Sequence, residues 1–238
     1  MGINIDLIYQ KTLQHYEKAY GHLVEQRSVL EHYQSSAISD VIPGFEADKL
    51  EFGSYDKENF AVLFVDMRGS TRRAENVGAE KTFLTMHVFL TALIEVVKYY
   101  KGKVIDIMGD GLMVFWGGRV AREKDGMNKI EAIKNAGCSG LAMLKVVEKV
   151  INRIIQEKAL GAPIHIGVGI DFGSVIVTKI GIKETYDVKA FGDCINNASH
   201  FSRNDDKVKV SAEVKNTWPT SENGTLRFVP TIDGYYLQ

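Results

Sequence analysis

Apolar residues recur at steps of three and four along residues 8–33, a spacing typical of a helix with one apolar face. The face consists of large side chains, namely Tyr9, Leu13, Tyr16, Tyr20, Leu23 and Leu30. This pattern predicts an N-terminal helix of roughly three heptads, which either packs on its own domain or pairs with a second helix as in a coiled coil. The periodicity then fails, and Pro43, Gly44 and Gly53 indicate a connector over residues 35–58.

The main domain is expected to begin with a continuous apolar run over residues 60–65, which is typical of a buried strand and ends in Asp66. Further along, residues 102–117 form two apolar runs joined by Gly109, Asp110 and Gly111. Two β-rich runs joined by Asp-Gly are a strong hairpin signal, so Asp110 is expected at a hairpin tip.

The remaining elements follow from the same periodicities. They are helices at about residues 72–101, 127–160 and 193–203, and strands at about residues 165–170, 175–180, 188–191, 208–210 and 226–229. The order strand, helix, hairpin, helix, strand predicts the α/β (α+β) class, with a ferredoxin-like βαββαβ sheet that carries its helices on one face. We therefore expect a helical segment over residues 1–34, the connector, and one main domain over residues 59–238.

Composition limits which partners and which cellular compartment are expected for this domain. The formal net charge of −1 gives no long-range attraction to nucleic acid or to an anionic membrane. Two cysteines, Cys138 and Cys194, are too few for a disulfide framework or a zinc cluster and agree with a reducing compartment. No apolar run approaches the ~18 residues of a membrane span, and the N-terminus lacks the regions of a signal peptide. We expect a soluble cytoplasmic protein that binds no nucleic acid.

The end of the first strand is the first candidate site. Asp66 is followed by Gly69, Ser70 and Thr71, which suit a tight bend into a helix. The free amides at such a helix start bind phosphate, and an adjacent carboxylate can bring the metal that neutralises it. An ordinary capping turn would have the same sequence.

Asp110 is a second acidic residue that is expected close to this turn. In a ferredoxin-like sheet the first strand lies beside the hairpin strands, so Asp66 and the hairpin tip are expected at one edge. Two carboxylates beside a phosphate-sized group of amides indicate a two-metal phosphoryl-transfer site, although both acids could be solvated loop residues. Asp106 adds a charge inside an apolar strand, where it costs free energy unless a partner or ligand compensates it.

A third group lies near the end of the chain. Lys189 is in an apolar strand, and Asn196 and His200 are four residues apart, hence on one face of the following helix. This polar face could hold a sugar and a phosphate, or it could be a solvated helix face.

The glycines Gly167, Gly169 and Gly173 match a dinucleotide-binding fingerprint only in part, because the third glycine is a residue too late and no helix follows. We expect them to serve strand crossing and a hairpin turn.

Taken in order, four segments resemble the consensus of the class III adenylate and guanylate cyclases. They are residues 64–71, 102–117, 165–173 and 191–199, and the resemblance extends over about residues 59–211. It implies a palm-type catalytic domain and a homodimer with active sites at the subunit interface. It also implies conversion of a nucleoside triphosphate into a 3′,5′-cyclic monophosphate and pyrophosphate.

The resemblance implies roles for the first two candidate sites. Asp66, Asp110 and the Met67 carbonyl of one subunit would hold two divalent cations, Mg²⁺ or Mn²⁺. Amides from Met67 to Thr71, with Gly69 and Ser70 between them, would cradle the phosphates.

For the other subunit the resemblance implies substrate contacts. Asp106 and Lys189 would contact the base, and Asn196 would orient the ribose. His200 stands where the family usually carries an arginine that steadies the phosphorus, and it could replace that arginine only when protonated. Arg203 or Lys183 could substitute for it.

The base-reading positions depart from the family. Asp106 and Lys189 match neither the adenine-selective nor the guanine-selective pair. A compact cyclase with rebuilt base-reading positions resembles the stand-alone pyrimidine cyclases of bacterial anti-phage (Pycsar-type) signalling. We therefore expect UTP, slightly favoured over CTP, as the substrate, with a guanylate or adenylate cyclase as the alternative. An alternative of another class is a catalytically degenerate nucleotide-binding regulatory domain.

Overall fold

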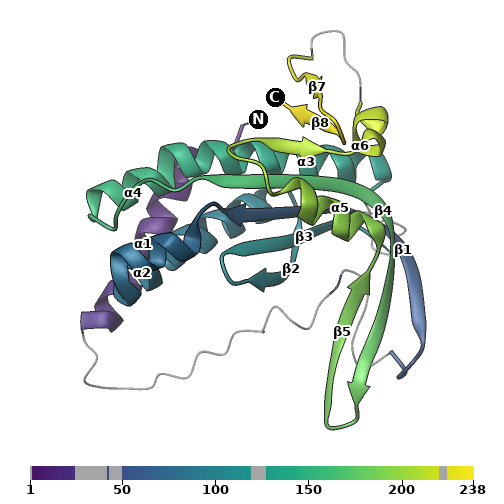
Figure 1. Ribbon diagram of the computed structural model, residues 1–238, viewed down its shortest axis with the longest axis horizontal. Helices are drawn as coiled ribbons and strands as arrows, with labels where there is room; N and C mark the ends of the chain where they lie inside the picture. Colours follow the sequence, from purple (N-terminus) through teal and green to yellow (C-terminus); the bar gives the residue numbers. More distant parts are fainter. Residues whose placement is uncertain (1, 25–41, 43–49, 119–126, 220–223) are drawn as a thin grey trace.

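The computed structural model describes residues 2–24, 42, 50–118, 127–219 and 224–238. Its centre is an eight-stranded sheet in the order β2-β3-β1-β4-β6-β8-β7, with β5 paired to β4 (Figure 1). The strands are β1 (Tyr55–Met67), β2 (Lys103–Met108), β3 (Gly111–Gly117), β4 (Ile166–Ile182), β5 (Thr185–Phe191), β6 (Val208–Val210), β7 (Phe228–Pro230) and β8 (Tyr235–Leu237). The central strand β1 is antiparallel to both β3 and β4, and the predicted α/β class is confirmed.

Helices cover both faces of this sheet. They are α1 (Ile5–Val24), α2 (Ser70–Tyr99), α3 (Lys129–Val146), which continues through a π-helical turn η4 (Val147–Ile151) into α4 (Asn152–Glu157), α5 (Asp193–Phe201) and α6 (Ala212–Thr217). Alternate residues of β1 enter different cores: Leu63 packs with α2 and α3, whereas Phe64 packs with Ala198 of α5. The two helices of the predicted ferredoxin-like unit, α2 and α3, share one face as expected, and α5 covers the other face, because a strand that is apolar at every position needs cover on both sides.

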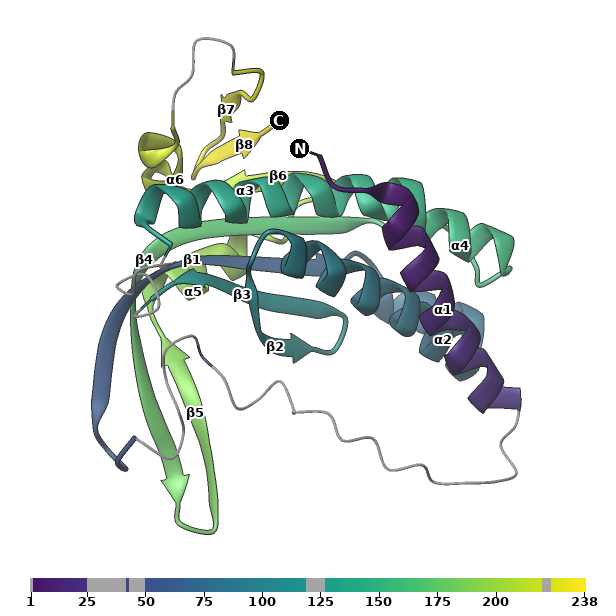
Figure 2. The ribbon, with the colours of Figure 1, turned by 180° about the vertical axis from the view of Figure 1, so that it is seen from behind.

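The N-terminal helix packs on its own domain. In α1, Ile8 and Tyr16 are buried against the core, and Lys11 Nζ lies 2.7 Å from Glu95 of α2 (Figure 2). The described part of the helix ends at Val24; the predicted continuation to residue 33, with Leu30 and most of the connector, lies outside the described residues.

The long strand β4 corrects the predicted pair of strands at 165–170 and 175–180. It runs without interruption from Ile166 to Ile182, and Gly173 pairs with Phe60 in the middle of the ladder. The hairpin turn comes later, between β4 and β5, which together form an arm that projects from the body (Figure 1).

The glycines of β4 also have a different role from the predicted one. A Cβ on Gly167 would overlap the carbonyl oxygen of Ser202, and one on Gly169 would overlap that of Ala198. These positions let α5 and the turn after it lie directly on the strand, because only glycine permits so close a backbone approach.

Among the described residues, α2 is the one helix long and apolar enough by composition to cross a membrane. Its apolar residues, such as Val88, Phe89 and Leu93, are buried in the core of the sheet. The high hydropathy of α2 is therefore explained by its packing as a core helix.

Candidate active site

The end of β1 and the tip of the β2–β3 hairpin meet at one edge of the sheet, as predicted. Asp66 is opposite Gly111 in the ladder, and the Met67 amide donates a hydrogen bond of 3.2 Å to the Asp110 carbonyl. Gly109 has φ 62°, so the tight turn places Asp110 at the tip. Asp66, near the end of β1, and Asp110, in the turn between β2 and β3, therefore lie close together.

Gly111 leaves the space between these strands open. A Cβ at this position would lie 2.7 Å from the Val65 carbonyl oxygen and 3.4 Å from Oδ1 of Asp66. A larger residue would press on the Asp66 carboxylate from the side of Asp110, so the Asp-Gly pair serves both the turn and the site.

The turn after Asp66 exposes the start of α2. Gly69 has the left-handed values φ 66° and ψ 25°, and α2 begins at Ser70 without a side-chain cap or an acidic residue in its first turn. The first amides of a helix have no partner within the helix and carry a partial positive charge. This start is suited to bind an anion, as the sequence predicted for Gly69, Ser70 and Thr71.

Arg68 also lies in this site, although the sequence did not predict it there. Its guanidinium forms an ion pair with the Asp66 carboxylate, and its amide donates a 2.8 Å hydrogen bond to the His165 carbonyl. The only signal in the sequence was a basic residue two positions after the acid.

The donor atoms at this edge suit a hard cation. Two carboxylates and main-chain carbonyls such as that of Met67 are all oxygen donors, which Mg²⁺ and Mn²⁺ prefer. Over the described ranges no group of three or more His, Cys, Asp or Glu side chains could hold a metal ion. A cation here would thus take its remaining ligands from phosphate oxygens and water, as Mg²⁺ commonly does.

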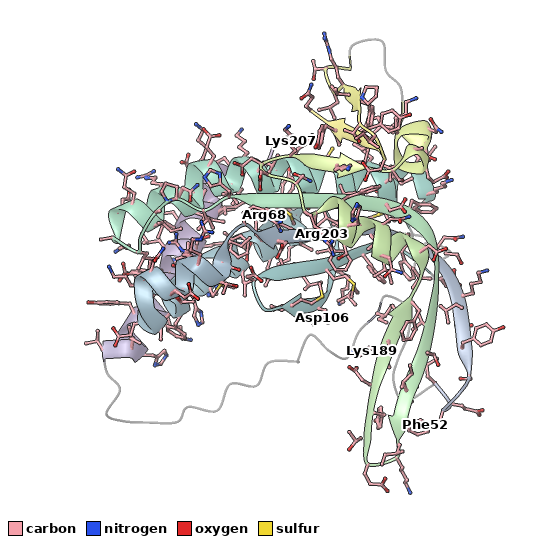
Figure 3. All side chains as sticks on the ribbon, viewed as in Figure 1. Phe52, Arg68, Asp106, Lys189, Arg203 and Lys207 are labelled. Carbon is pink, nitrogen blue, oxygen red and sulfur yellow. The ribbon has the colours of Figure 1, made fainter. Side chains whose placement is uncertain are left out.

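Asp106 and Lys189 form the second group. The Lys189 ammonium lies 2.6 Å from Oδ2 of Asp187, which raises the pKa of Lys189, and the charge of Asp106 raises it further. The structure thus brings β2 and the arm close enough for Asp106 and Lys189 to interact, and Figure 3 marks both residues. Sequence reasoning missed Asp187, although residues two apart on a strand share a face.

Asn196 lies exposed on α5, which is anchored by its neighbour. Asn197 donates a 2.9 Å hydrogen bond to the buried carboxylate of Asp171 on β4. This bond and the buried residues Cys194, Ala198 and Phe201 hold α5 on the sheet with Asn196 exposed.

The three residues considered as phosphate contacts differ in their surroundings. His200 Nε2 lies 3.5 Å from Oδ2 of Asp233, a carboxylate that also pairs with Lys209. Arg203 is exposed in the turn just beyond α5 (Figure 3), seven positions after Asn196 in the sequence. Lys183 lies in the turn of the arm, between β4 and β5.

The two groups lie in different parts of one chain. Lys189 pairs with Thr178 of β4, and Thr178 pairs with Tyr55, at the opposite end of β1 from Asp66. Asp66 and Asp110 thus supply carboxylates at one edge, while Lys189 supplies a donor on the arm.

Solved structures share this architecture. The chain aligns with the guanylyl cyclase Cya2 at a TM-score of 0.61 and 21% identity, covering 76% of this chain and 91% of that one. It aligns with the adenylyl cyclase CyaB from P. aeruginosa at a TM-score of 0.64 and 20% identity, covering 77% of this chain and 94% of that one. At these identities the likeness shows the palm fold of cyclase domains alone.

Two curated relatives carry pyrimidine names. A protein of Staphylococcus aureus named cytidylate cyclase is 30% identical over 123 residues, which cover 50% of this chain and 27% of that protein. A protein of Gulbenkiania mobilis named uridylate cyclase is 27% identical over 181 residues, which cover 72% of this chain and 66% of that protein. The chain therefore spans less than two thirds of the length of each relative.

The decisive match is to a family of catalytic domains. The family described as adenylate and guanylate cyclase catalytic domain matches residues 52–227. This range contains β1 with Asp66, the hairpin with Asp110, the arm with Lys189, and α5 with Asn196. The chain belongs to the adenylate and guanylate cyclase catalytic domain family, and its fold and recognised motifs are those of a class III nucleotidyl cyclase.

Proposed function

We propose that this domain converts a pyrimidine nucleoside triphosphate, UTP in preference to CTP, into the 3′,5′-cyclic monophosphate and pyrophosphate. The observation that carries the proposal is the convergence of Asp66 and Asp110 beside the uncapped start of α2. A phosphoryl-transfer site needs carboxylates for cations and amide donors for phosphate, and this edge offers both.

In the proposed reaction the ribose 3′-hydroxyl attacks the α-phosphorus. The O3′–Pα bond forms, the bond from Pα to the bridging oxygen breaks, and pyrophosphate leaves with that electron pair while the hydroxyl proton is released to water. Asp66, Asp110 and the Met67 carbonyl would hold two divalent cations, Mg²⁺ or Mn²⁺. When bound, these cations would lower the pKa of the ribose 3′-hydroxyl and neutralise the charge of the phosphates. The amides of Met67 and Arg68 already donate to the Asp110 and His165 carbonyls, so those of Gly69, Ser70 and Thr71 would hold the triphosphate and align it for attack.

The base preference rests on Asp106 and Lys189. The carboxylate of Asp106 only accepts hydrogen bonds and the ammonium of Lys189 only donates them. Uracil offers an N–H beside a carbonyl, which matches one fixed acceptor and one fixed donor. Cytosine can use its amino group and an acceptor, and guanine also presents N–H groups beside a carbonyl, so CTP and GTP are the competing substrates. The names of the two curated relatives support a pyrimidine.

The proposed active unit is a homodimer with sites at the subunit interface. The metal-binding edge of one subunit would face Asp106, Lys189 and Asn196 of the other. The separation of Lys189 from Asp66 within one chain supports this arrangement. For the phosphate, Arg203 is the favoured cation near Asn196, because His200 already lies beside Asp233.

We place the enzyme in the cytoplasm as a second-messenger synthase of anti-phage defence, on the resemblance to pyrimidine cyclases and on the free thiols of Cys138 and Cys194. A plaque assay on cells with the wild-type or the Asp66→Asn protein tests the defence role. Equal phage sensitivity would contradict it.

One observation favours a second candidate, a nucleotide-binding regulatory domain without turnover. His200 stands at the family's arginine position and is occupied by Asp233. Incubation of the purified protein with each of the four ribonucleoside triphosphates and Mn²⁺, followed by mass analysis of products, separates the candidates. Cyclic UMP as the main product supports our proposal, a cyclic purine alone contradicts the base preference, and binding without product favours the regulatory domain.

A further inference from the structure

We infer that Arg68 is the resident counter-cation of Asp66 and competes with a divalent cation for that carboxylate. The inference rests on the proposed function, because it assumes that Asp66 is a metal ligand. It assigns Arg68 as a positioning residue that sets the affinity of the metal site and couples it to nucleotide binding.

The geometry of Arg68 carries the first step. Its main chain is fixed, since its amide donates to the His165 carbonyl at 2.8 Å. Its guanidinium pairs with Asp66 while its side chain is only 22% exposed. A guanidinium paired with this carboxylate occupies the oxygens that a metal ion would need, and its positive charge repels a second cation.

The pairing leaves the guanidinium incompletely satisfied. Nε of Arg68 is buried and has no hydrogen-bond partner among the described residues. A guanidinium carries five N–H donors, and a buried donor without an acceptor costs free energy. The guanidinium of Arg68, paired with Asp66, thus retains N–H donors without acceptors. Additional oxygen acceptors nearby would satisfy these donors.

A source of acceptors lies next to Arg68. The uncapped start of α2 follows directly at Gly69 and Ser70, where the proposed triphosphate binds. When a divalent cation takes Asp66, the released guanidinium can pair with phosphate oxygens, a geometry that arginine favours. Entry of the cation and of the triphosphate would thereby assist each other.

A neighbouring arginine provides a matched control. Arg72 lies in the first turn of α2, is exposed, and has no ion pair among the described contacts. Arg73 is unsuitable because its guanidinium binds the Leu160 and Ala162 carbonyls. Arg68→Gln and Arg72→Gln remove the same charge close to the same site, so their difference isolates the contact with Asp66.

The test measures Mn²⁺ binding without nucleotide, from the electron paramagnetic resonance signal of free Mn²⁺. We expect Arg68→Gln to bind Mn²⁺ about tenfold more tightly than the wild type. Arg72→Gln should change the affinity less than about twofold, since an exposed charge is screened. Arg68→Lys keeps a charge but loses the planar fork, and should lie between wild type and Arg68→Gln.

The possible outcomes distinguish a failure of this inference from a failure of the proposed function. Mn²⁺ binding that persists unchanged in Asp66→Asn would contradict the metal site itself. Binding that depends on Asp66 but is equal or weaker in Arg68→Gln would overturn the competition alone. An equal increase of Mn²⁺ affinity in Arg68→Gln and Arg72→Gln would also overturn the inference. The effect would then come from the loss of positive charge near the site and not from the contact with Asp66. Adding inorganic triphosphate should tighten Mn²⁺ binding more in the wild type than in Arg68→Gln, and the reverse order would contradict the coupling.

Discussion

The amide of Met67 donates a hydrogen bond to the carbonyl of Asp110 across 3.2 Å. This bond joins the residue after Asp66 to the hairpin tip, so the two carboxylates are set by one stretch of β ladder. Because both belong to the same rigid sheet edge, we expect them to act as a unit. Asp66→Asn or Asp110→Asn should lower cyclase activity about 100-fold or more while the protein stays folded.

The measurement is the rate of cyclic product formation with Mn²⁺, together with circular dichroism. The exposed residue Asp205, placed after α5, provides the control Asp205→Asn, which should retain activity. Full activity in both site variants would remove the carboxylates from the mechanism.

Base recognition should depend on Lys189. Lys189→Met removes the donor proposed to face the base, so KM for UTP should rise about tenfold while kcat changes less. Steady-state kinetics with UTP, CTP and GTP would detect the change as a loss of base selectivity. Lys183→Met, in the exposed turn of the same arm, should leave selectivity unchanged. An unaltered selectivity in Lys189→Met would exclude this lysine from base reading.

The phosphate-facing cation should be Arg203. Arg203→Ala removes an exposed guanidinium in the turn after α5, and we expect kcat to fall about tenfold with little change in KM. The comparison variant is Arg227→Ala, which removes an exposed arginine of the C-terminal segment. A larger fall of kcat in His200→Ala than in Arg203→Ala would reverse the assignment.

Close packing of α5 should require Gly169. A Cβ there would overlap the Ala198 carbonyl oxygen, a main-chain atom that cannot move aside as the end of a flexible side chain could. Gly169→Ala should lower the free energy of unfolding by about 1–3 kcal/mol in urea denaturation. In Gly21→Ala the new Cβ meets no atom within 4 Å, and alanine in the helix α1 should stabilise by up to about 1 kcal/mol. Equal stability of Gly169→Ala and wild type would contradict the packing argument.

Docking of α1 should weaken in acid. Tyr9 Oη donates a 2.6 Å hydrogen bond to Glu157, which lowers the pKa of Glu157 below its ordinary value of 4.5, with Arg153 lowering it further. For a carboxyl whose pKa is lower in the folded state, the stabilisation is present above the unfolded pKa and is lost as pH falls through the folded pKa.

Thermal unfolding between about pH 6 and about pH 3 should therefore show a steeper decline for wild type than for Tyr9→Phe. Tyr20→Phe removes the hydroxyl of an exposed tyrosine on the same helix and should follow the wild-type curve. Parallel curves for wild type and Tyr9→Phe would show that this bond contributes nothing to the pH dependence.

Local sequence determined the parts of the site that depend on neighbours in the chain. The apolar run before Asp66 encodes β1, and the Gly-Asp-Gly turn encodes the hairpin that carries Asp110. Strand pairing then brings the two acids to one edge, and the sequence predicted that step from the order of elements alone. The physical reason is that turn chemistry and hydrophobic periodicity act over a few residues.

Tertiary packing decided the rest. Whether Gly167 and Gly169 end a strand or admit a helix depends on α5, which covers them from some 30 residues away in sequence. The pairing of Arg68 with Asp66 and of Lys189 with Asp187 depends on which rotamers the folded chain allows, and periodicity carries no information on that. The sequence by itself thus placed Asp66, Asp110 and Lys189, and only the folded chain revealed Arg68 and Asp187, which pair with Asp66 and Lys189.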